Sequence, residues 1–119
     1  MARLQLRLMF DTVQMGPGKA ELMEHIRETG SISAAGRRMD MSYKRAWTLI
    51  EELNTAFAQP LVQSSRGGAG GGGAQLTEAG AEVLRLFRQI EAELAEVAAP
   101  HVGALEALLR PAGDIPDRK

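Results

Sequence analysis

Cysteine is absent from this chain of 119 residues, and histidine occurs only as His25 and His101. Without cysteine the fold has no disulfide bond and no thiolate ligands for zinc. Glu21 lies four residues before His25 and could share a metal ion with it, but two ligands leave a zinc site incomplete. No serine, histidine and acidic residue stand at a spacing typical of nucleophilic catalysis. We therefore expect no metal site, no cofactor, no catalytic residue and no enzyme activity.

Aromatic residues make up only 4% of the chain, and no apolar run approaches the roughly 20 residues that a membrane-spanning helix needs. The core must therefore consist mainly of Leu, Ile, Val, Met and Ala. The N-terminus alternates polar and apolar residues, whereas a signal peptide would be continuously apolar. With 45% hydrophobic and 24% charged residues, the composition is typical of one soluble globular domain. We expect it in the cytoplasm, without a membrane partner.

Neither sign of charge dominates, because the formal net charge is −1. This total argues against a generally basic nucleic-acid coat. The charges are nevertheless unevenly distributed. Residues 1–66 carry nine Lys or Arg against seven Asp or Glu, and residues 67–119 carry five against eight. The first half is therefore the more basic one, although this asymmetry alone decides nothing.

The first part of the chain predicts a strand and a helix. Strict alternation over residues 3–10 is typical of one half-buried edge strand, with Leu4, Leu6, Leu8 and Phe10 on its apolar face. Turn residues at 15–18 then lead into a helix over 17–29, which Gly30 ends. This helix is predicted to bury Leu22, Met23 and Ile26.

Two further helices are predicted directly afterwards. The second helix is short, and Ser33 is predicted to cap its first turn. Ser42 is predicted to cap the third helix, whose apolar residues follow the i, i+3, i+4, i+7 rule. These apolar residues are Ala46, Leu49, Ile50, Leu53 and Phe57.

A glycine-rich hairpin is predicted after Pro60, with extended segments at 61–65 and 74–76. We call residues 61–76 the wing. Its glycines satisfy the G-x-G-x-x-G dinucleotide fingerprint, but a strand rather than a helix follows them, so we reject that interpretation. A backbone without side chains can approach a duplex closely and donate amides to phosphates. A flexible linker is the alternative, but it does not explain the flanking strand signals. The candidate wing residues are Arg66, Gly67, Gly68, Gly70, Gly71, Gly72 and Gly73.

Two closely linked helices, the second opening on Ser-Tyr-Lys-Arg, and a hairpin after them are typical of a winged helix-turn-helix. We predict a mainly α fold with a small β component, in which residues 1–76 form a core that binds double-stranded DNA. The third helix would enter the major groove and the preceding helix would cross the backbone. The candidates for base readout are Ser42, Tyr43, Lys44, Arg45 and Thr48, and those for phosphate contacts are Ser31, Ser33, Arg37 and Arg38.

Some of these residues allow a second interpretation. The basic side chains of the second and third helices could form an ordinary solvated surface. For Trp47 we favour a residue that packs over the edge of the core rather than a DNA contact.

A fourth helix is predicted over 77–99, with Thr77 as its cap and Pro100 as its end. Its apolar residues recur at heptad spacing, which favours pairing with the same helix of a second subunit. Packing within one subunit is the alternative, and we expect it for Val83. Residues 100–119 are predicted to be a short amphipathic segment and a flexible tail. The predicted dimer interface consists of Val83, Phe87, Ile90, Leu94 and Val97.

Four runs of sequence, residues 28–35, 41–47, 60–62 and 67–80, together resemble the N-terminal DNA-binding domain of ModE-type molybdate-responsive regulators. LysR-type regulators look like a more distant match. The resemblance covers roughly residues 3–97, and it implies a dimeric repressor or activator. In that family a separate C-terminal domain binds molybdate or tungstate, and residues 100–119 are too few to form it. Molybdate or tungstate would then act only through a partner, such as a separate sensor protein, or through an unrecognised site.

We therefore expect a homodimeric, sequence-specific DNA-binding transcriptional regulator, with a link to molybdenum or tungsten homeostasis that rests on the resemblance alone. Two other classes stay open: a protein-interaction module with a winged fold, and a small oxyanion-binding protein that uses the glycine loop. Binding that weakens steeply with salt would distinguish DNA binding from a mainly apolar protein interface. Thermal stabilisation by molybdate or tungstate would indicate an oxyanion site. The operator, the direction of regulation and the effector do not follow from the sequence.

Overall fold

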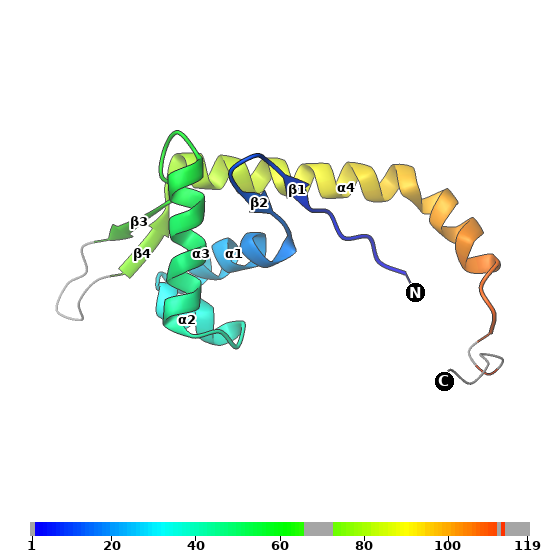
Figure 1. The fold of residues 1–119 in the computed structure, drawn as a ribbon, viewed down its shortest axis with the longest axis horizontal. Coiled ribbons are helices and arrows are strands. Elements are labelled where there is room, and N and C mark those ends of the chain that lie inside the picture. Colours follow the sequence, from blue (N-terminus) through cyan, green and yellow to red (C-terminus); the bar gives the residue numbers. More distant parts are fainter. Residues whose placement is uncertain (1, 66–72, 112, 114–119) are drawn as a thin grey trace.

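The computed structural model describes residues 2–65, 73–111 and 113, and within them it contains four helices and two small antiparallel hairpins (Figure 1). The mainly α fold with a small β component is confirmed. In chain order the elements are β1 (Leu8–Met9), β2 (Gln14–Met15), α1 (Pro17–Thr29), α2 (Ile32–Arg38), α3 (Tyr43–Ala56), β3 (Val62–Ser65), β4 (Gly73–Leu76) and α4 (Glu78–Ala107).

The N-terminal segment differs from the single strand predicted over residues 3–10. Only β1 is a strand there, because the chain reverses after it and pairs with β2 over two residues. Met15, predicted as part of a turn, is a buried core residue in β2. The predicted inward face is only half correct, because Leu6 and Leu8 pack against the core while Leu4 and Phe10 are exposed.

The core lies between α1, α2, α3 and the first turns of α4. The predicted burial of the α1 residues is confirmed, and so is the end of α1. Gly30 has a left-handed backbone with φ 70°, and its N–H donates to the Ile26 carbonyl at 2.8 Å. No polar or charged residue is buried among the described residues. The centre of the core consists of Leu22, Met23, Ile26, Ala35, Ala46, Ile50, Leu53, Leu61, Leu84 and Phe87.

A small-residue contact lets α2 and α3 approach each other closely. Gly36 of α2 is buried, and a Cβ atom there would lie 3.1 Å from the Cβ of Ala46. The connection between the helices passes through Asp40, whose φ of 56° is left-handed. Aspartate is among the residues that adopt this conformation most readily outside glycine. The tight helix-turn-helix is therefore built into the local sequence.

The wing hairpin joins the helices to α4. Its strands pair with Val62 opposite Leu76 and Ser65 opposite Gly73. The Ala74 N–H of β4 donates to the Gly30 carbonyl at 2.9 Å, which ties the hairpin to the α1–α2 connection. The wing residues Arg66, Gly67, Gly68, Gly70, Gly71 and Gly72 lie outside the described residues, whereas Gly73 begins β4.

The helix α4 begins as predicted but continues much further. The Thr77 hydroxyl accepts a hydrogen bond from the Gly80 N–H at 2.9 Å, so the predicted cap is confirmed. The predicted end at Pro100 is wrong, because α4 runs through it to Ala107, and the proposed boundary between 99 and 100 disappears with it. Proline removes one backbone donor. The carbonyl one turn earlier then has no N–H partner within the helix. Water can bind this carbonyl, because the helix is exposed here, so the helix is not interrupted.

The far half of α4 projects beyond the core (Figure 1). Its 30 residues give it a length of about 45 Å, and the whole molecule extends 59 Å along its longest axis. Phe87 belongs to the subunit's own core, where it is 2% exposed, so its assignment to a dimer interface is wrong. Val83 also packs partly against this core. Leu94 and Val97, by contrast, are 42% and 69% exposed.

Candidate nucleic-acid interface

The N-terminus of α3 lies at the surface and is capped as the sequence predicts. The Ser42 hydroxyl accepts a hydrogen bond from the Arg45 N–H at 3.0 Å, and the Ser42 carbonyl accepts one from the Ala46 N–H at 3.0 Å. The first bond satisfies a donor of the first turn that would otherwise lack a partner, and the second is the first bond within the helix. The side chains of Tyr43, Lys44 and Arg45 are left exposed in that turn.

The exposed face of α3 has three parts. At roughly 100° per residue, Lys44 lies at the centre of the face, opposite the buried side of the helix. Tyr43 and Trp47 form one flank, next to the α2 N-terminus and the hairpin. Arg45 lies on the other flank, where it lines a hollow with Arg7. Tyr43 and Arg45 thus point about 160° apart, so they cannot contact the same base pair.

Trp47 differs from its sequence interpretation. We expected it to cover the edge of the core, but it is 45% exposed, and Tyr43 one helical turn earlier is 56% exposed. Thr48, the fifth residue predicted for base readout, is half-buried and lies beside Glu51 and Thr55. The exposed face of α3 therefore presents two aromatic rings, Tyr43 and Trp47, and two cations, Lys44 and Arg45, at its N-terminal end.

The cap of α2 is Ser31, and the prediction of Ser33 is wrong. The Ser31 hydroxyl accepts a hydrogen bond from the Ala34 N–H at 3.0 Å. Thr29 fixes this arrangement, because its hydroxyl oxygen accepts from the Ser31 N–H at 3.2 Å. Capping uses only the acceptor capacity of Ser31, so its O–H is free to donate to another group. Ser33 stands inside α2 instead, where its hydroxyl accepts from the Arg37 guanidinium at 2.9 Å.

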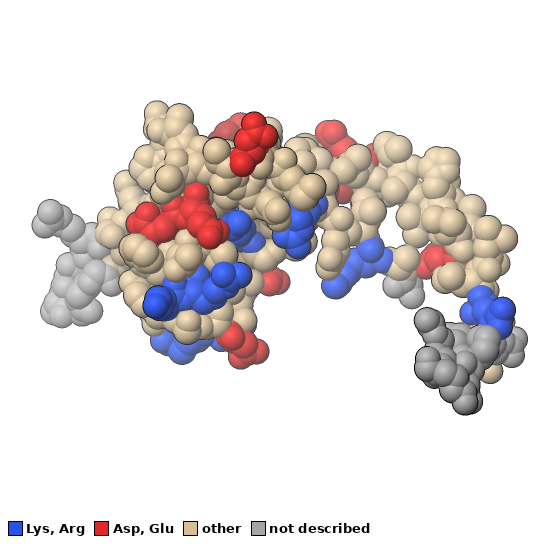
Figure 2. Space-filling view, viewed as in Figure 1, with Lys and Arg blue, Asp and Glu red and all other residues tan. Residues whose placement is uncertain are grey.

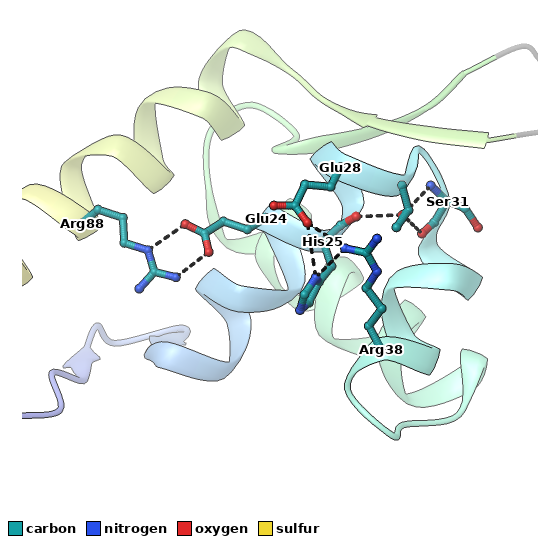
Figure 3. A network of polar contacts seen from close by, with 7 residues as sticks. Glu24, His25, Glu28, Ser31, Arg38 and Arg88 are labelled. Carbon is teal, nitrogen blue, oxygen red and sulfur yellow. Dashed lines mark hydrogen bonds and ion pairs between the residues drawn. The ribbon is translucent and has the colours of Figure 1, made fainter. Parts of the chain in front are cut away.

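Arg38 is held by α1. Its Nη1 donates to the Glu28 carboxylate at 2.7 Å and lies 3.3 Å from Nδ1 of His25 (Figure 3). A phosphate would therefore have to compete with Glu28 for Arg38. Arg37 faces no carboxylate within the described residues. Of the two predicted phosphate contacts from this pair, Arg37 is the more available.

Charge is unevenly distributed over this face. Figure 2 shows Lys and Arg side chains gathered where α2 and the N-terminal part of α3 lie, with Asp and Glu side chains above them. On α3 the acidic residues are Glu51 and Glu52, and Lys19 of α1 pairs with Glu52 at 3.5 Å. On α3 itself, the cations Lys44 and Arg45 therefore lie at the N-terminal end, and the acidic residues lie further along the helix.

Asn54 holds the wing against α3, a function that our sequence analysis did not identify. Its Oδ1 accepts from the N–H groups of Leu61 and Val62 at 2.8 and 3.1 Å, and its Nδ2 donates to the Val62 carbonyl at 2.9 Å. Thr77 adds a bond at the other strand, because its hydroxyl donates to the Pro60 carbonyl at 2.7 Å. The hairpin is thus fixed relative to the exposed face of α3.

A two-pronged ion pair fixes α4 relative to α1. Arg88 donates from Nε and Nη2 to the two carboxylate oxygens of Glu24 at 2.9 and 2.8 Å (Figure 3). Its Nη1 donates to Glu91 at 2.8 Å. The hydrogen bond from Arg88 holds the pKa of Glu24 below its ordinary value, against the opposing effect of partial burial. The same bond to Glu24 raises the pKa of Arg88.

Replacing Glu24 with glutamine should lower the unfolding free energy by about 1 kcal/mol at neutral pH, because a third of each partner is open to solvent. The folded-state pKa of Glu24 is depressed, so its contribution is complete above the unfolded-state value of 4.5 and is lost as the pH falls through the folded-state value. Denaturant unfolding of wild type and Glu24→Gln at several pH values should show the two converging in acid. Glu82→Gln, which removes an exposed pair within α4, is the matched control and should change less. A pH-independent difference would contradict this account.

The part of the chain that the structure describes contains neither a cluster of metal ligands nor a helix that could span a membrane. Within residues 2–65, 73–111 and 113, no three His, Cys, Asp or Glu side chains gather as metal ligands would. In the same part of the chain, no helix combines the length and the apolar character needed to cross a membrane.

Comparison with known proteins adds a family to this geometry. Residues 18–81 match the model of the bacterial regulatory helix-turn-helix proteins of the lysR family. The molybdenum-pterin-binding protein MopB of Rhodobacter capsulatus is 42% identical over 84 residues, which are 71% of this chain and 31% of MopB. The DNA-binding transcriptional dual regulator ModE of Escherichia coli K12 is 39% identical over 85 residues, 71% of this chain and 30% of ModE. The chain thus spans about a third of the length of these relatives.

Solved structures show the same fold. The CbnR_DBD–DNA complex matches with a TM-score of 0.57 at 24% identity, covering 75% of this chain and 95% of that one. The full-length regulator LysG of Corynebacterium glutamicum with bound arginine matches with a TM-score of 0.56 at 23% identity, covering 79% of this chain and 30% of that one.

Proposed function

Because this chain belongs to the lysR family of bacterial regulatory helix-turn-helix proteins, we propose that it is a transcriptional regulator that binds specific DNA sequences as a homodimer. The observation that carries the proposal is the position of Lys44. It is the second residue of α3 and lies at the centre of the exposed face, beside the capped N-terminus. In helix-turn-helix proteins this part of the recognition helix meets base edges in the major groove.

The neighbouring elements support the same docking. The Ser31 hydroxyl and the Arg37 guanidinium lie on α2, which precedes α3 and would cross the phosphate backbone. The hairpin is held by Asn54 next to the Tyr43 and Trp47 flank of α3, where a wing would lie along the duplex. The net charge of −1 is compatible with this function, because Arg37, Lys44 and Arg45 are exposed on the parts of α2 and α3 that would meet DNA.

The homodimer is proposed from the apolar residues of α4 that the subunit's own core does not cover. Leu94 and Val97 are exposed, Ile90 is half-buried, and the three repeat at heptad spacing. Pairing of these residues between two copies would bury them. Two α3 helices related by a two-fold axis would then favour a palindromic operator with half-sites about 34 Å apart.

The proposal is tested by selecting from a pool of random duplexes at moderate salt and titrating the best site with salt. A palindrome should emerge, and the logarithm of its affinity should fall with the logarithm of salt by about 0.9 per neutralised phosphate. Failure to retain any duplex at low salt would contradict the proposal and would favour a protein-interaction module.

Single substitutions should separate the two kinds of contact. Replacing Lys44 with alanine should cost about 1–3 kcal/mol of binding free energy at one base position and relax specificity there. Replacing Arg37 with alanine should weaken all duplexes alike and reduce the salt slope by about 1. Affinity measurements on the selected operator and on single-base variants check this. The assignment of roles is wrong if Lys44→Ala weakens every duplex equally.

A link to molybdenum is part of the proposal, because relatives over this region bear the names ModE and molybdenum-pterin-binding protein. On this proposal the protein acts in the cytoplasm and has no catalytic step. We assign no molybdate-binding residue in this chain, so the oxyanion would act through a sensor domain or a separate sensor protein. Molybdate or tungstate added to the chain alone should leave operator affinity and melting temperature unchanged. Thermal stabilisation would favour an oxyanion-binding protein instead.

A further inference from the structure

A shallow hollow lies between α2, α3 and the hairpin, with a volume of about 270 Å³. Tyr43 and Trp47 supply its aromatic surface from α3, and hydroxyls reach it from three serines on the other elements. Among the residues that the structure describes, no Lys, Arg, Asp, Glu or His lines it. The serines are Ser31, Ser33 and Ser64.

The aromatic part of this lining favours an apolar occupant over a phosphate. A phosphate would instead bind at the edge of the hollow, where Arg37 donates to the Ser33 hydroxyl and Lys44 lies on the adjacent part of the α3 face. Aromatic rings with about half of their surface exposed instead present apolar area to whatever docks there. The occupant should therefore be an apolar group within a polar surrounding.

Among the groups that the four base pairs present in the major groove, the thymine 5-methyl is the apolar one. Tyr43 and Trp47 are the first and fifth residues of α3, so they occupy the two N-terminal turns that would enter the groove. We propose that these two rings contact a thymine methyl in each half-site and make the protein select thymine at that position. This inference rests on the proposed function.

The test compares thymine with deoxyuridine, which differs only by lacking the methyl. Each thymine of the selected operator is replaced in turn, and the affinity of wild-type protein is measured. At one thymine per half-site the affinity should fall about fourfold, because burying one methyl-sized group contributes about 0.8 kcal/mol and tenfold corresponds to 1.4 kcal/mol. Operator binding that is insensitive to every replacement would overturn the inference while leaving the proposed function intact.

Variants locate the effect. Trp47→Ala should bind the thymine and deoxyuridine operators equally, whereas Lys44→Ala should bind both more weakly and keep the fourfold difference. Trp47→Phe keeps an aromatic ring and should retain part of the difference, with folding of each variant checked by thermal unfolding. Discrimination that persists in Trp47→Ala would overturn the inference. If wild-type protein retains no duplex at all, the proposed function itself has failed.

Discussion

Replacing Gly80 with alanine should lower the unfolding free energy by about 3 kcal/mol and the melting temperature by about 10–20 °C. A Cβ at this position would lie 2.1 Å from the Leu61 carbonyl oxygen and 2.9 Å from its carbon. Both are backbone atoms, and hydrogen bonds hold them in place. The Leu61 carbonyl accepts from the Thr77 N–H, and the Leu61 N–H donates to Asn54. Alanine must therefore push α4 away from the base of the hairpin.

Gly103→Ala is the matched control for this substitution. Gly103 lies in the same helix, and a Cβ there would meet no atom within 4 Å. Alanine favours the helix over glycine, so this variant should gain up to about 1 kcal/mol. Thermal and denaturant unfolding of both variants measure the contrast. If both variants are equally stable, α4 does not pack against Leu61 as described.

Replacing Asn54 with alanine should cost about 2–3 kcal/mol of stability, because three hydrogen bonds to the backbone of Leu61 and Val62 are lost together. The N–H groups of these two residues would lose their acceptor in a part-buried place. Operator affinity should fall as well, even at temperatures where the variant is folded, because the hairpin is then no longer fixed beside α3.

Two other substitutions test the hydrogen-bond account. Asn54→Asp keeps the acceptor for both N–H groups and loses only the donor to the Val62 carbonyl, so it should retain more stability than Asn54→Ala. Thr55→Ala, at the neighbouring exposed position, should change stability by less than about 0.5 kcal/mol. An Asn54→Ala variant as stable as Thr55→Ala would contradict the account.

Local signals in the sequence predicted the helix ends well. Ser42, Thr77 and Gly30 each act within one turn of their own position, so the sequence is sufficient to find them. The α2 cap shows the limit of this approach. Ser31 and Ser33 are equally good cap residues, and Thr29 decides between them through a hydrogen bond to the Ser31 N–H.

Features that depend on tertiary contacts were less predictable. The heptad pattern placed Phe87 in a dimer interface, but the pattern cannot distinguish a partner subunit from the core of the same chain. Pro100 is a strong local signal for a helix end. The helix α4 nevertheless continues through it, because this part of the helix is exposed. In the candidate site, Trp47 was interpreted from its size alone. Its exposure depends on how α2 and the hairpin lie beside α3, and the sequence of α3 alone does not show this arrangement.

The contacts at the base of α4 connect the long helix to the rest of the subunit. Its first turn is joined to the hairpin through Thr77 and Gly80, and Arg88 joins it to α1 through Glu24. We therefore expect the exposed face of α3 and the base of α4 to move together. Over about 45 Å, a tilt of about 5° displaces the end at Ala107 by about 4 Å, more than the rise of roughly 3.4 Å per base pair along the DNA axis. In the proposed dimer, the angle at which two α4 helices meet would set the register of both α3 helices on their half-sites. A signal that changed this angle by a few degrees would be enough to bring the two copies into or out of register with DNA.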